Sequence, residues 1–74
     1  MTTSKQAQHQ IANMAAACDV SAEQMQAILT RAGVEVVGRR RFRHLITGET
    51  LNADYALRLV VVAWLDYRKE QQDE

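Results

Sequence analysis

Five arginines gather in the middle of the chain, four of them within five residues. They are Arg31, Arg39, Arg40, Arg41 and Arg43, and the stretch 31–44 that holds them carries one acid, Glu35. A guanidinium group donates paired hydrogen bonds to a phosphate or a carboxylate, so such a cluster is suited to an anionic surface. The alternative is a solvated basic face. The density of the cluster favours binding, either to nucleic acid or to an acidic protein surface.

The overall charge balance complicates a nucleic-acid assignment. The chain has 9 basic and 9 acidic residues, hence a formal net charge of zero, whereas nucleic-acid-binding proteins usually carry a basic excess. Several acids lie near the C-terminus, at Asp66, Glu70, Asp73 and Glu74. The sequence therefore predicts a dipolar molecule with one basic patch.

Residues that could carry catalysis or hold a metal are sparse. His9 and His44 lie far apart, Cys18 is the only cysteine, and no metal-ligand spacing occurs. No nucleophile–base set or phosphate-binding glycine loop can be traced. We expect no enzymatic activity, no cofactor and no metal.

Length and cysteine usage set the expected class and compartment. Seventy-four residues predict a single domain, 1–74. One cysteine excludes an internal disulfide and fits a reducing cytosol. The longest apolar run, 59–65, is shorter than the roughly 20 residues of a membrane span, and no signal peptide is apparent. We expect a cytoplasmic protein with no membrane contact.

The segment 5–32 predicts two helices joined by a tight turn. The first is expected over 5–17 after a frayed 1–4, with Thr3 or Ser4 as its cap, and the second over 22–32. Ser21 is a good N-cap, and Gln24 three residues later completes a capping box. Asp19 tolerates the left-handed turn, and Gly33 suits the end of the second helix. The apolar positions that pack the pair are Met14, Cys18, Val20, Met25 and Ile28.

Between 34 and 51 the pattern changes to that of short strands. The β-branched stretch 34–37 predicts one strand, 38–39 a two-residue turn, and 40–46 a second strand. Alternation places Phe42 on one face as core and Arg41 and Arg43 on the other. A turn at 47–48 and a short strand over 49–51 complete the hairpin region.

The segment 52–71 predicts a long helix, followed by a solvated tail over 72–74. The valine run 60–62 makes a strand the competing prediction. This helix carries more apolar surface than a small domain readily buries. Val60, Trp64 and Tyr67 are therefore either core or part of an exposed stripe that marks a homodimer or partner interface.

The order helix, helix, hairpin, helix, with Met14–Leu29 as the helix pair and Gly38-Arg-Arg-Arg-Phe-Arg43 in the hairpin, resembles the small winged helix-turn-helix regulators of phage excisionase-like and MerR-like type. The resemblance implies a mainly α fold with a small β-hairpin (α+β), in which the hairpin is the wing. It further implies that the second helix enters the major groove, with Gln26 on a base edge and Ser21 or Thr30 on a phosphate. Glu23 on that face counts against this role, and the alternative is a helix pair that serves only for packing.

Two functions of different kinds follow. The first is a small phage-type transcription regulator that binds nucleic acid, duplex DNA above all, through the arginine-rich wing and the helix-turn-helix. The second is a phage-type protein that binds host RNA polymerase or another transcription factor through the same surfaces. Zero net charge and the acidic residue on the second helix favour the second function.

Overall fold

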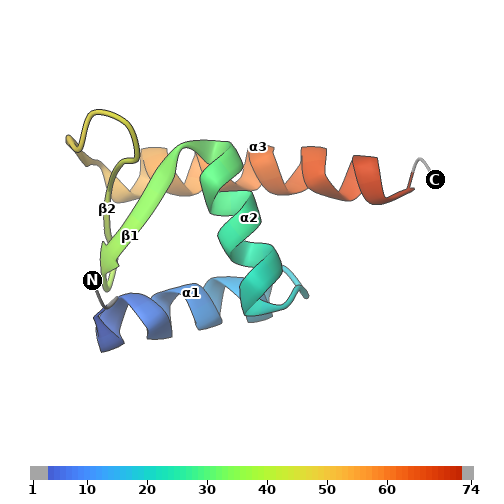
Figure 1. Ribbon diagram of the computed structural model, residues 1–74, viewed down its shortest axis with the longest axis horizontal. Coiled ribbons are helices and arrows are strands. Elements are labelled where there is room, and N and C mark those ends of the chain that lie inside the picture. Colours follow the sequence, from blue (N-terminus) through green and yellow to red (C-terminus); the bar gives the residue numbers. More distant parts are fainter. Residues whose placement is uncertain (1–3, 73–74) are drawn as a thin grey trace.

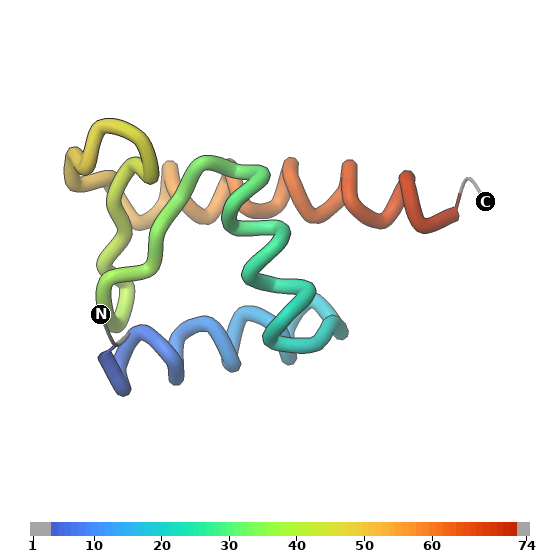
Figure 2. The backbone as a smooth tube through the Cα atoms, in the orientation of Figure 1, coloured from blue at the N-terminus to red at the C-terminus, as the bar shows by residue number. Residues whose placement is uncertain are grey.

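The computed structural model describes residues 4–72 and shows an α+β arrangement of three helices and a small antiparallel sheet (Figure 1). The elements are, in chain order, α1 (Lys5–Ala17), α2 (Ala22–Ala32), β1 (Val34–Gly38), β2 (Arg41–His44), β3 (Thr50–Leu51) and α3 (Ala53–Gln72). The first and last helices lie on opposite sides of the molecule, with α2 and the sheet between them (Figure 2). The hairpin region and α2 thus connect two outer helices.

The ends of the helices follow from local side-chain chemistry. Ser4 caps α1 by accepting the amide of Ala7, which confirms one of the two predicted caps. Residues 1–3 of the predicted frayed end lie outside the described part of the chain. Ser21 and Gln24 form the predicted capping box of α2. Gly33 ends α2 in the left-handed conformation (φ 75°), where glycine carries no side-chain penalty.

The last segment of the chain, from Ala53 to Gln72, forms helix α3 and not the competing strand. The side chain of Asn52 accepts hydrogen bonds from the amides of Asp54 (2.9 Å) and Tyr55 (3.3 Å), which satisfies two free donors at the start of α3. The helix then runs unbroken through the valines of 60–62 to Gln72. The helix prediction is confirmed over 59–65, and the competing strand is excluded there. Residues 73–74 of the predicted tail are not described.

The sheet has the order β1-β2-β3, with both pairs antiparallel. Val36 pairs with Phe42 and Glu35 with Arg43, and the register shifts between Val36 and Gly38. The predicted turn at 38–39 was therefore misplaced by one residue: Gly38 belongs to β1, and the turn residues are Arg39 and Arg40. Arg40 has a φ of 55°, an unfavourable conformation for a residue with a Cβ.

One apolar cluster fills the space between the three helices and the inner face of the sheet. Phe42, Met25 and Ile28 are its largest fully buried side chains, each 1% exposed or less. Phe42 carries the inner face of β2, as predicted, and Arg41 and Arg43 on either side of it are exposed. The core therefore fixes which face of the hairpin presents its arginines to solvent.

Candidate nucleic-acid interface

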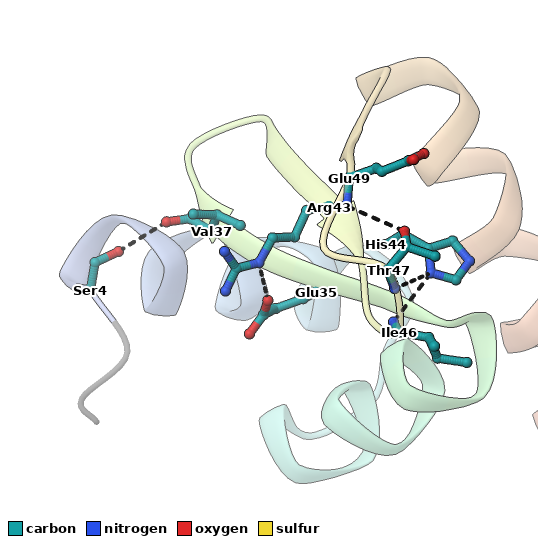
Figure 3. Close-up of polar contacts among 8 residues, drawn as sticks. All are labelled: Ser4, Glu35, Val37, Arg43, His44, Ile46, Thr47 and Glu49. Atoms are coloured by element: carbon teal, nitrogen blue, oxygen red, sulfur yellow. Dashed lines mark hydrogen bonds and ion pairs between the residues drawn. The ribbon is translucent and has the colours of Figure 1, made fainter.

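The turn between β1 and β2 lies against the first half of α1 instead of standing clear of the domain. The backbone amide of Arg40 donates to the side-chain oxygen of Gln10 (3.2 Å). The hydroxyl of Ser4 donates to the carbonyl of Val37 (3.4 Å), as Figure 3 shows. These two contacts fix the hairpin turn relative to α1, so the arginines at the turn have a defined position.

Three of the five arginines are engaged by acidic side chains. Arg43 pairs with Glu35 across the β1–β2 ladder (Figure 3). Arg31 binds the carboxylate of Glu70 with both terminal nitrogens, although 39 residues separate the two in sequence. Arg40 lies 4.0 Å from the carboxylate of Asp54, with both side chains well exposed. These arginines are therefore partly neutralised by neighbours on the protein itself.

Two of these ion pairs also shift the pKa of Arg31, Glu70 and Arg43. The hydrogen bond from Arg31 holds the pKa of Glu70 below its ordinary value, and the same bond raises the pKa of Arg31. The hydrogen bond to Glu35 raises the pKa of Arg43.

Arg39 and Arg41 are exposed and form no ion pair with any residue between 4 and 72. Arg39 borders a groove on α1. The side chain of Arg41 lies beside Gly38, where an added Cβ would be 3.5 Å from its Cδ. The predicted cluster of five thus reduces to two uncompensated guanidinium groups at the end of the hairpin.

The outward face of α2 offers weaker chemistry than the sequence suggested. Gln26, Thr30 and Ser21 are exposed, as predicted. However, the Thr30 hydroxyl donates to the carbonyl of Gln26 (3.0 Å), and the Ser21 hydroxyl accepts from the amide of Gln24 (3.1 Å). Glu23 is exposed on this helix, and Arg31 is held by α3. The only cation of α2 is therefore already paired, and the polar side chains of this helix have no unpaired cation beside them.

Sequence reasoning missed a polar row on α1 beside the hairpin turn. A surface groove there is lined by Gln6, His9, Gln10, Asn13 and Arg39. The four α1 members follow the i, i+3, i+4, i+7 spacing of a helix flank. The same periodicity is visible in the sequence of α1, on a different flank from the apolar positions that predict its buried face.

The predicted interface on the last helix is also placed differently. Val60 is 3% exposed and belongs to the core, which contradicts a role in an interface; Trp64 and Tyr67 are partly buried against that core. The exposed large apolar side chains of α3 are instead Val61 (47%), Val62 (59%) and Leu65 (51%), with Tyr55 (55%) near the start of the helix. Homodimerisation through this helix remains a prediction.

The loop at the other end of the sheet is organised by His44. Its Nδ1 accepts hydrogen bonds from the amides of Ile46 (3.2 Å) and Thr47 (3.3 Å), as Figure 3 shows. Its own amide donates to the carbonyl of Glu49 (2.7 Å). Ile46 is consequently held outward and is 87% exposed. His44 therefore has a structural role in this loop.

Within residues 4–72, no three His, Cys, Asp or Glu side chains come together as metal ligands, and none of the helices there is apolar over a length that could cross a bilayer. Burial raises the pKa of the Cys18 thiol, which makes it a poor nucleophile at neutral pH. Trp64 lies beneath the guanidinium of Arg68, 5.0 Å from the ring centre, an attractive contact.

Comparison with protein-family models, with curated proteins and with solved structures gave no match to this chain.

Proposed function

We propose that this chain is a small, phage-type winged helix-turn-helix regulator of transcription that binds duplex DNA without catalysing a reaction. In this proposal the β1–β2 hairpin is the wing, and α1 with α2 is the helix-turn-helix. The observation that carries it is the pair Arg39 and Arg41, exposed and unpaired among the described residues at a turn anchored to α1. Such guanidinium groups are suited to adjacent phosphates.

The charge distribution supports contact with a few phosphates and not a broad electrostatic attraction to DNA. The net charge of the chain is zero, and Arg31, Arg40 and Arg43 each have an acidic partner. A protein that contacts two or three phosphates binds DNA weakly and with a modest dependence on salt. We therefore expect low affinity for arbitrary sequences.

The direct test is fluorescence anisotropy of a labelled duplex of random sequence, titrated with the protein at about 50 mM and then about 200 mM salt. The proposal predicts binding that weakens by about tenfold or more between the two conditions, because each contacted phosphate contributes about 0.9 to the dependence of log affinity on log salt. Absence of binding at the lower salt would contradict the proposal.

A second candidate function is binding to RNA polymerase, favoured by the exposed apolar face of α3. Val61, Val62 and Leu65 are about half exposed, and the exposed cations Arg58 and Lys69 share this outward face by helical spacing. An apolar surface with acidic edges on the polymerase would complement them. This candidate uses a different surface from the hairpin, so the two functions can be tested separately.

For this candidate, the Val62→Asp/Leu65→Asp variant is expected to lose binding to purified bacterial RNA polymerase. Biolayer interferometry with the immobilised chain measures this binding. A buried carboxylate in an apolar contact is costly, so the loss should be about tenfold or more. The control is Ile46→Asp, which changes an exposed apolar side chain in the loop between β2 and β3. This variant should bind RNA polymerase as the unaltered chain does. Failure of the unaltered protein to associate at low salt would exclude this function.

A further inference from the structure

We propose that the polar row on α1, and not the outward face of α2, is the surface that distinguishes one DNA sequence from another. The inference rests on the proposed function, because it assumes that Arg39 and Arg41 hold a duplex against the protein. The row comprises Gln6, His9, Gln10 and Asn13.

The dimensions of the row match a short stretch of duplex. The four positions lie along one flank of α1, and from Gln6 to Asn13 the helix rises about 10 Å. Successive base pairs are about 3.4 Å apart, so the row spans about three base-pair steps. An α-helix fits in the major groove, which is about 12 Å wide. The row is therefore long enough to contact consecutive base edges.

The chemistry of the row suits base edges better than that of α2. A Gln or Asn amide presents one donor group and one acceptor, the pattern that complements N7 and N6 of adenine. Helix α1 contains no acidic residue between Lys5 and Ala17, so nothing on it repels phosphates. Helix α2 carries Glu23 outward, and its only cation is held by Glu70.

The row also lies next to the hairpin turn, which is the element that would bind the phosphate backbone of the DNA. Arg39 lines the same groove, and Gln10 accepts the amide of Arg40 at 3.2 Å. Contacts to phosphate fix the register of a protein on DNA, and contacts to base edges provide the specificity. Because the turn is bonded to α1, a phosphate held at Arg39 would keep the row in one register on the bases.

The test is a selection of duplexes from a pool with a randomised central segment, followed by sequencing, for three proteins. They are the unaltered chain, the Gln6→Ala/Asn13→Ala variant and the matched control Gln26→Ala/Thr30→Ala on α2. Neither pair includes Gln10, which bonds the turn, and Ala favours helix at all four positions, so both variants should fold. Circular dichroism verifies this.

The unaltered chain and the α2 variant are expected to enrich the same short, adenine-containing motif. The α1 variant should lose this enrichment by about tenfold or more, since each paired amide contact contributes strongly to discrimination. Its affinity for random duplex should change less than about threefold, because phosphate contacts supply non-specific binding.

Three results would overturn the inference. One is loss of the motif in the α2 variant with retention in the α1 variant. Another is salt-sensitive binding of random duplex by the unaltered chain without any enriched motif, which would leave the proposed DNA-binding function standing. The third, no duplex binding by the unaltered chain at low salt, would overturn the proposed function together with the inference, and the anisotropy measurement identifies this case.

Discussion

The Phe42→Ala variant is expected to lose about 3–5 kcal/mol of unfolding free energy, the range measured when a buried aromatic side chain is truncated. Phe42 is 1% exposed and is the largest fully buried side chain of the core. A domain of this size has little stability in reserve. We therefore expect the variant to be largely unfolded near 25 °C, as measured by urea titration followed by circular dichroism.

The matched control for this prediction is Ile46→Ala in the neighbouring loop. Ile46 is 87% exposed, so its truncation should change the unfolding free energy by less than about 0.5 kcal/mol. A loss below about 1 kcal/mol for Phe42→Ala would mean that the core does not hold the hairpin in place. The distinction matters for function because Arg41 and Arg43 flank Phe42 on β2, and their outward orientation depends on its burial.

The helices could be predicted from the sequence because their limits depend on neighbouring residues. Ser21, Gln24 and Gly33 determine the ends of α2 through contacts within four residues, and apolar spacing identifies the buried face. For α3, the length of the segment outweighed the modest helix propensity of its three valines.

The hairpin register could not be predicted, and the reason is the backbone at its turn. Glycine is the usual residue for a positive φ, so the sequence predicts a turn that begins at Gly38. In the structure Arg40 adopts the positive φ, and an irregularity between Val36 and Gly38 absorbs the extra residue. The predicted two-residue turn would have paired Glu35 with Phe42. The observed register pairs Glu35 with Arg43 and thereby neutralises one predicted binding residue.

The candidate site was predicted only in part because charge neutralisation is a property of the tertiary fold. Arg31 and Glu70 are 39 residues apart, and their ion pair forms only when α2 packs on α3. The sequence also gave no sign that the hairpin turn would lie beside α1. The proposed base contacts of the polar residues of α1 therefore depend on their position next to Arg39, which the sequence does not indicate.

The Arg39→Ala/Arg41→Ala variant is expected to bind random duplex DNA about tenfold or more weakly than the unaltered chain at low salt, because both guanidinium groups are free to contact phosphate. Each lost phosphate contact reduces the magnitude of the slope of log affinity against log salt by about 0.9, so the magnitude should fall by about two. Anisotropy at several salt concentrations measures both quantities. The substituted side chains are exposed, so stability should change little.

The control that separates a local contact from a general charge effect is Arg68→Ala/Lys69→Ala, which removes two charges from exposed positions on α3. These positions lie about 20 Å along the helix from Asp54, the residue of α3 that is near Arg40. Screening confines the influence of a charge to about 10 Å at 0.1 M salt, so this variant should bind within about threefold of the unaltered chain. Equal weakening by both variants would contradict a site at the hairpin turn. Arg43→Ala should have a smaller effect than either Arg39→Ala or Arg41→Ala, because Glu35 already compensates the charge of Arg43. The order of these single-variant effects therefore tests whether the ion pairs described above decide which arginines are available for DNA.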